Sequence, residues 1–221
     1  MKKKEKHEVK ERIIIAVAII IIGVPFFFTP PDVFTFGVGA LAGIAVFELF
    51  EISRGVREYK DVLLTVVFAV YLFISLFLFC RLRFSENGLE WLLFGVFSVG
   101  AFDAASYLGG RKFGKHKIVA RISPKKTVEG VISGFAGVIV VSLIVSLIVR
   151  KLLFPLFSLQ IAAVIIGIFA FLGDLFESFL KRRMRVKHSG VLLKSHGGLL
   201  DRIDSALAGI YGIYLLRLFF N

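Results

Sequence analysis

The sequence predicts an all-α, polytopic membrane protein with about seven transmembrane helices. Of its 221 residues, 57% are apolar and 20% are charged, and the mean hydropathy is +0.84. Soluble domains average roughly 45–50% apolar and about 25% charged residues. This composition argues against a soluble globule. The single cysteine, Cys80, also argues against a disulfide scaffold or a thiolate zinc cluster.

Seven apolar runs are long enough to cross a bilayer, which takes about 20 residues in a helix. They are 13–29, 33–52, 62–80, 89–107, 131–149, 157–179 and 200–220. The first run follows a lysine-rich start, as in a signal peptide. Because no small-residue cleavage site follows it, we interpret this run as an uncleaved anchor.

The distribution of Lys and Arg predicts the orientation. When the segments between spans are assigned alternately to the two sides, 23 of the 28 basic residues fall on the side of the N-terminus and 5 on the other. Cytoplasmic loops carry such an excess, so we expect the N-terminus inside and the C-terminus outside. The same rule explains the net charge of +12 without a nucleic-acid partner.

We interpret the chain as one membrane domain in three parts. Residues 1–12 form a basic cytoplasmic tail, 13–98 form N-terminal transmembrane helices, and 99–221 form a membrane region with two polar cytoplasmic loops.

Carboxylates lie near the ends of the spans that this orientation places toward the cytoplasm. Asp174 with Glu177, and Asp201 with Asp204, are pairs three residues apart, so each pair shares a helix face. The other acids of this group are Asp103, Glu48 and Glu51. Ionisable groups at membrane depth are costly, which makes them functional candidates, and two such faces can hold a hard divalent cation.

Simple ion pairing is the alternative for these acids. Glu177 has Lys181 one helical turn later, and Asp201 has Arg202 or Arg185 nearby.

Glycines and basic residues occur together in two loops, one formed by segments 109–117 and 123–130 and the other by segments 178–182 and 196–204. Glycine lets a backbone approach an anion, and Lys and Arg supply the opposing charge, so the combination suits phosphate groups. Attraction to an anionic leaflet, about 1 kcal/mol per basic residue, is the alternative. We favour a metal–phosphate site because such a site needs acids as well as cations.

Two motifs resemble the signature of one family, the phosphatidate cytidylyltransferases. The first comprises Ser178-x-Leu-Lys-Arg182, Lys187, Gly190, Leu193 and His196-Gly-Gly-Leu-x-Asp-Arg-Ile-Asp204. The second comprises Asp103, Tyr107, Gly109, Gly110, Arg111, Gly114, Lys115 and Ser123-Pro-Lys-Lys-Thr-x-Glu-Gly130. Together they cover roughly residues 100–205, about half of the chain.

The resemblance implies an integral enzyme of the cell membrane whose active site faces the cytoplasm and lies in region 99–221. The reaction would join CTP and phosphatidic acid, a membrane lipid, into CDP-diacylglycerol and pyrophosphate with Mg²⁺. A second metal or a monovalent cation stays open, and a homodimer is a family expectation. The implied metal ligands are Asp174 and Asp201.

The remaining roles follow from the same motif positions. The expected catalytic residues are Asp174, Asp201, Lys181 and His196. The expected phosphate-binding residues are Lys125, Lys126, Arg182, Arg202, Gly197, Gly198, Arg111 and Ser123. The expected supporting residues are Asp103, Glu129, Glu177, Ser178 and Asp204. His196 is expected to donate a hydrogen bond to pyrophosphate, because a phosphate with a second pKa of about 6 needs no general base.

Two positions depart from the family pattern. His188 replaces the usual Asp, and Lys194 stands where Pro, Gly or Ser is usual. Loop variation in an active enzyme is one interpretation, and altered substrate choice or reduced activity is the other. Two further hypotheses are a CTP-dependent lipid-alcohol kinase and a catalytically degenerate transporter or scaffold.

Overall fold

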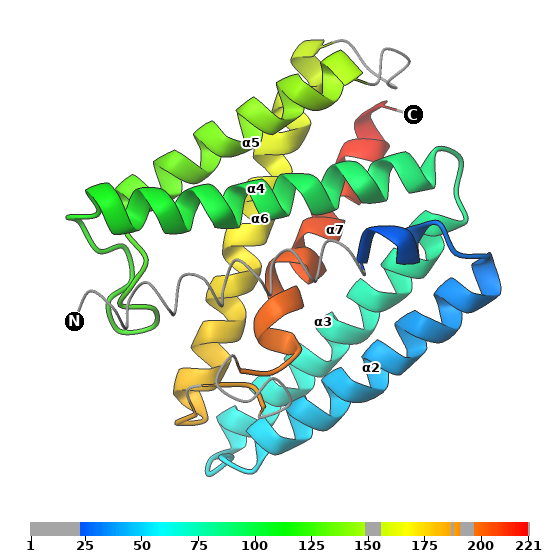
Figure 1. Cartoon of the computed structure of the whole chain (residues 1–221). Helices are drawn as coiled ribbons and strands as arrows, with labels where there is room; N and C mark the ends of the chain where they lie inside the picture. The colour runs from blue at the N-terminus through cyan, green and yellow to red at the C-terminus, as the bar shows by residue number, and fades with distance from the viewer. Residues whose placement is uncertain (1–22, 149–155, 187, 191–196, 221) are drawn as a thin grey trace, which may run out of the picture.

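The computed structural model describes residues 23–148, 156–186, 188–190 and 197–220. These residues are helical apart from their connections (Figure 1), and the long helices are α2 (Pro31–Ser53), α3 (Tyr59–Arg83), α4 (Gly88–Phe113), α5 (Val128–Ile148), α6 (Leu156–Arg183) and α7 (Leu200–Phe220). They confirm the helices predicted for the second to seventh apolar runs. The basic tail and most of the first predicted span lie outside the described residues.

Local signals explain where several helices begin. Pro31 stands at the first position of α2, where its missing N–H costs nothing. Glu58 and Asp61 form a capping box at the start of α3. Before α5, the Thr127 hydroxyl accepts a hydrogen bond from the Gly130 N–H (3.1 Å), as an N-cap residue does.

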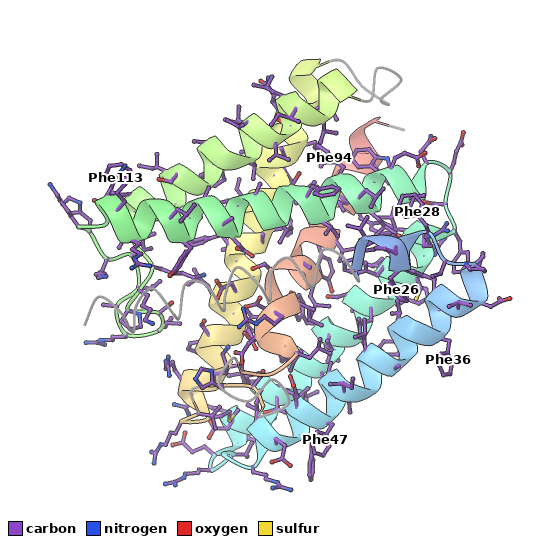
Figure 2. The ribbon with its side chains drawn as sticks, in the orientation of Figure 1. Phe26, Phe28, Phe36, Phe47, Phe94 and Phe113 are labelled. Atoms are coloured by element: carbon purple, nitrogen blue, oxygen red, sulfur yellow. The ribbon has the colours of Figure 1, made fainter. Side chains whose placement is uncertain are left out.

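Five helices, α2 to α6, are long and apolar enough to span a membrane. Only 22–39% of their most apolar windows is buried inside the protein, so most apolar side chains on them face outward. Phe36 and Phe47 of α2 point away from the bundle in Figure 2, and they are 81% and 59% exposed. Such an exterior suits lipid rather than water, and the chain is therefore an integral membrane protein.

The seventh predicted span, α7, is the most enclosed helix. It carries Asp201, Arg202, Asp204 and Arg217 and is not among the five apolar helices. It packs against α6, α4 and α3, and its buried face comprises Leu207, Ala208, Ile210, Ile213 and Leu216. A Cβ on Gly212 would lie 3.2 Å from the Cα of Ile166, so α6 and α7 approach closely. The polar N-terminus of α7 is thereby held among its neighbours.

Small residues join α4 to α5. A Cβ on Gly137 of α5 would lie 2.5 Å from the Ala105 Cβ and 3.0 Å from the Ala101 carbonyl oxygen, both in α4. Gly109 and Gly110 belong to this contact as well, since Gly109 faces Ser133 and Gly110 faces Thr127. The sequence placed these two glycines in a phosphate loop, and that interpretation is wrong. They lie inside α4, where they let two helices pack.

The three connections expected in the cytoplasm lie at one end of the bundle. In Figure 1 the α2–α3 connection, the α4–α5 loop and the start of α7 all lie toward the lower left, and the α3–α4 connection lies at the opposite end. This clustering agrees with the alternation inferred from the charges. The N-in, C-out orientation stays a prediction.

Candidate functional site

Lys181, in the last turn of α6, lies between two carboxylates from two helices. Its Nζ donates to Oε2 of Glu177, one turn earlier (2.6 Å), and also to Oδ1 of Asp201 at the start of α7. The Glu177 side chain is only 1% exposed. A buried carboxylate needs such a cation, so this cluster fixes the end of α6 to the start of α7.

Both carboxylates form ion pairs, and a metal site on Asp201 stays a prediction. Glu177 does pair with Lys181, as simple helical spacing suggested. Asp201 pairs with the same lysine, a partner that lies on another helix.

A second ion pair joins the second motif to α6, four residues before the first motif begins. Nζ of Lys126, in the α4–α5 loop, lies 2.7 Å from Oδ2 of Asp174 on α6. The same ammonium group lies 4.7 Å from the ring centroid of Phe171, a favourable cation–π distance. Oδ1 of Asp174 accepts a longer hydrogen bond from the Ser178 hydroxyl (3.3 Å). Lys126, expected to bind phosphate, thus contacts Asp174, expected to bind a metal.

The α4–α5 loop has further ties to α6 and to itself. Nε of Arg182 donates to the Ile122 carbonyl oxygen (3.2 Å). The Ser123 carbonyl oxygen accepts from the Lys126 N–H (3.2 Å), which closes a turn around Lys125. Lys125 is exposed, and so is Arg111, whose guanidinium lies 3.5 Å from the Tyr107 hydroxyl at the end of α4. Lys125, Arg182 and Arg111 therefore lie on the surface of the protein.

Glu129, expected to be a supporting residue, orders this loop from the first turn of α5. Its carboxylate accepts hydrogen bonds from the Lys115 N–H (3.0 Å) and the His116 N–H (3.2 Å). The His116 ring nitrogen Nδ1 lies 2.6 Å away. An isolated bridge between Lys117 and Thr127 then closes the base of the loop.

Two further acids, Asp103 and Asp204, lie where α4 meets the start of α7. Asp103 of α4 accepts a 3.4 Å hydrogen bond from the Ser205 hydroxyl of α7. Asp204, whose Oδ1 accepts a hydrogen bond from the Ser205 N–H (2.7 Å), lies beside this contact. Oε1 of Glu177 is buried and has no hydrogen-bond partner among the described residues. Asp103 is exposed and Asp204 is half-buried, so Glu177 is the buried acid here, and its unpaired oxygen needs a cation or another polar partner.

A magnesium ion would have to be held by few protein groups. Within the described residues, no three Asp, Glu, His or Cys side chains converge as a metal cage. Mg²⁺ is usually bound by one or two carboxylates, with water and substrate phosphates completing its shell. The residues present fit this open arrangement. Asp174 is the more accessible carboxylate, with 32% of its side chain exposed against 13% for Asp201.

Backbone N–H groups near the start of α7 donate hydrogen bonds to a carboxylate of the protein itself. The Gly198 N–H donates to Oδ2 of Asp201 (2.9 Å), and the Ser189 N–H donates to the same oxygen (3.1 Å). Gly197 has a φ of +86°, a left-handed conformation that favours glycine. Binding of phosphate by Gly197 and Gly198 stays a prediction, because in this arrangement the Gly198 N–H already has a carboxylate partner.

The structure gives positions for only some of the remaining expected site residues. Arg202 is exposed in the first turn of α7. Nδ1 of His188, the residue that departs from the family pattern, lies 3.8 Å from Oδ2 of Asp201. His196 lies outside the described residues, as do Lys187, Leu193 and Lys194, so the expected role of His196 has no position here.

Sequence reasoning gave no role in the site to Arg183, and it named Glu48 as a candidate acid without assigning it a role. Glu48 of α2 accepts hydrogen bonds from the backbone of Leu199 and Leu200. Arg183 of α6 donates to Asp61 (2.6 Å) and Glu58 (2.7 Å) at the start of α3. An acidic residue at membrane depth is a sequence signal for a functional role of Glu48. Nothing in the sequence pattern, however, indicates that its partners are Leu199 and Leu200, more than 150 positions away.

The fold and the site define an integral membrane protein whose lysines and carboxylates are paired at one end of a helical bundle. Residues 53–220 match the model of the cytidylyltransferase family. The chain belongs to this family, which confirms the resemblance seen in its motifs.

Individual relatives give the same picture. The chain is 37% identical over 157 residues to the phosphatidate cytidylyltransferase of Bacillus subtilis strain 168, covering 69% of this chain and 57% of that protein. It is 37% identical over 163 residues to the phosphatidate cytidylyltransferase of Thermotoga maritima, covering 71% and 57%. It is 44% identical over 124 residues to the uncharacterized protein YnbB of Escherichia coli K12, covering 55% and 40%. The chain spans about half the length of these relatives.

Proposed function

We propose that this protein is a phosphatidate cytidylyltransferase, which converts CTP and phosphatidic acid into CDP-diacylglycerol and pyrophosphate. The observation that carries the proposal is the ion pair between Lys126 and Asp174, which brings an expected phosphate ligand to an expected metal ligand at one end of the bundle. The family match and the names of two of the relatives support the same reaction class.

In this reaction a phosphate oxygen of the lipid attacks the α-phosphorus of CTP. A new P–O bond forms there, and the bond to the bridging oxygen breaks, so that pyrophosphate leaves with that oxygen and its electron pair. Catalysis of such transfers rests mainly on positioning and charge stabilisation. Lys126 and Lys181 would exchange a carboxylate partner for a phosphate oxygen, and the exposed Lys125, Arg182 and Arg202 would neutralise the remaining charge.

Asp174 and Asp201 would hold Mg²⁺, which when bound neutralises phosphate charge and polarises the transferring group. Glu177 and Asp204 would orient these ligands through Lys181 and the packing of α6 on α7. For Asp201 to bind a metal through Oδ1, Lys181 must give up that oxygen. His196 keeps its expected role as a hydrogen-bond donor to pyrophosphate.

The position of the site suits its two substrates. Under the predicted orientation the site faces the cytoplasm, where CTP is dissolved, and lies at the ends of helices that contact lipid. The lipid phosphate then reaches the lysines without removal of the acyl chains from the membrane.

The decisive test is transfer of label from α-labelled CTP into lipid. Purified protein in liposomes containing phosphatidic acid and Mg²⁺ is expected to form labelled CDP-lipid. Asp174→Asn should lower the rate at least about 100-fold, a typical loss for one electrostatic group in the transition state. Asp32→Asn is the matched control, because Asp32 is exposed in the first turn of α2 at the opposite end of the bundle.

Two other results would contradict the proposal. Label entering lipid from γ-labelled CTP would identify a lipid-alcohol kinase. No transfer of either label by folded protein, at any Mg²⁺ concentration, would favour the degenerate transporter or scaffold. In that case His188→Asp, which restores the residue usual in the family, is the first variant to test.

A further inference from the structure

Glu48 reaches the first motif, residues 178–204, from outside the part of the chain that matches the family. It lies on α2, before the matched residues 53–220, and is only 1% exposed. Its Oε1 accepts the Leu199 N–H (2.7 Å), and its Oε2 accepts the Leu200 N–H (2.8 Å) and the Ser189 hydroxyl (3.2 Å). One carboxylate therefore joins α2, the α6–α7 connection and α7.

Glu48 completes the hydrogen bonding of the start of α7. The N–H groups at a helix start have no partner within the helix and need one elsewhere. Here Gly198 donates to Asp201, and Leu199 and Leu200 donate to Glu48. The Asp201 N–H donates to the Ser189 hydroxyl (3.3 Å), which itself donates to Glu48. Glu48 and Asp201 thus divide these donors between them, and both carry the negative charge that a helix N-terminus favours.

The same carboxylate explains two glycines of the motif. A Cβ on Gly198 would overlap both carboxylate oxygens of Glu48, and a Cβ on Gly190 would lie 2.9 Å from Oε1. Glycine at these positions leaves the space that Glu48 fills. The motif and the residue on α2 are therefore fitted to each other.

We propose that Glu48 is a positioning residue, which holds the first turn of α7 and Ser189 so that Asp201 faces Lys181. Its effect on the reaction rests on the proposed function, whereas its effect on the α7 backbone does not. The charge is essential, because a glutamine would offer one acceptor oxygen and would turn an NH₂ group toward one of the two backbone N–H groups.

The test compares Glu48→Gln with Glu51→Gln in the full-length protein. Glu51 lies on the same helix, one turn later, and pairs with Arg54 near the surface. Hydrogen exchange is measured at Leu199 and Leu200, and the kinetics of label transfer are measured as a function of Mg²⁺. We expect Glu48→Gln to accelerate exchange of both amides about tenfold or more and to lower kcat about 10-fold to 100-fold, with the KM for CTP little changed and the Mg²⁺ requirement raised. Glu51→Gln should change neither.

Each other result has a definite meaning. If hydrogen exchange at Leu199 and Leu200 is unchanged in Glu48→Gln, the proposal is wrong. If exchange is faster but kcat and the Mg²⁺ dependence are unchanged, Glu48 caps the helix and does not position Asp201 for the reaction. If exchange rises throughout α5 as well, the variant has unfolded. Glu48→Asp then decides, since it keeps the charge and should restore part of the protection and of the activity. If the unmodified protein transfers no label, the proposed function fails, and exchange alone decides whether Glu48 holds this turn.

Discussion

At the scale of single residues, Lys181 shows how one cation serves two purposes. It neutralises the buried Glu177 within its own helix and holds Asp201 of the next. A buried ion pair adds little net stability against an apolar pair, but removal of one partner leaves an uncompensated charge. Lys181 is therefore expected to matter for folding as well as for catalysis.

Substitution of Lys181 separates these two effects. Lys181→Met should lower the free energy of unfolding by about 3–5 kcal/mol, because it leaves Glu177 buried without a cation. In the double variant Lys181→Met, Glu177→Gln, most of this stability should return while label transfer stays lost. Denaturation midpoints in detergent measure the first quantity. If the double variant is as unstable as the single one, Glu177 is not the charge that Lys181 compensates.

At the scale of elements, close packing of α4 on α5 sets the position of the loop that carries Lys126. The contact depends on glycines. A Cβ added at Gly137 would meet a Cβ and a backbone carbonyl oxygen of α4. Neither neighbour can rotate away. Any added atom must move the two helices apart and shift the loop at their ends.

Gly137→Ala tests this contact. We expect a loss of about 1–3 kcal/mol of stability, typical of overpacking, together with weaker label transfer. Gly100→Ala is the matched control, because a Cβ at Gly100 of α4 meets nothing within 4 Å. The control should be neutral or stabilising by up to about 1 kcal/mol, since alanine favours a helix. Equal thermal stability of the two variants would show that α4 and α5 are not in close contact.

At the scale of the whole molecule, charge and apolar surface together place the protein in the membrane. The helices α2 to α6 turn apolar side chains outward, and the basic loops gather at one end of the bundle. The positive-inside rule assigns that end to the cytoplasm.

Cysteine labelling tests this orientation. In a Cys80→Ala background the chain has no cysteine. Glu86→Cys, in the α3–α4 connection, should react with a membrane-impermeant maleimide in intact cells, whereas Lys117→Cys, in the α4–α5 loop, should react only in inverted vesicles. Both positions are exposed. The opposite pattern would place the site on the outer face and contradict access from cytoplasmic CTP.

Much of the fold could be predicted because its signals are local. Six of the seven apolar runs correspond to described helices, since about 20 apolar residues without a strong break must form a helix in lipid. The prediction of a loop was wrong where the residue type favours a loop but the packing of two helices requires glycine. Gly109 and Gly110 look like loop residues in the sequence, but they lie inside α4 because α5 needs their space.

The sequence by itself determined the membrane class, the helices and the family, because composition, apolar periodicity and motif spacing are properties of the linear chain. Only the tertiary structure decided which charges meet. Lys126 pairs with Asp174, Lys181 with Asp201, and Glu48 with the backbone of α7. These partners are 20 to more than 150 residues apart, and ion pairs and hydrogen bonds act over a few ångströms in space, so the packing of the helices selects them.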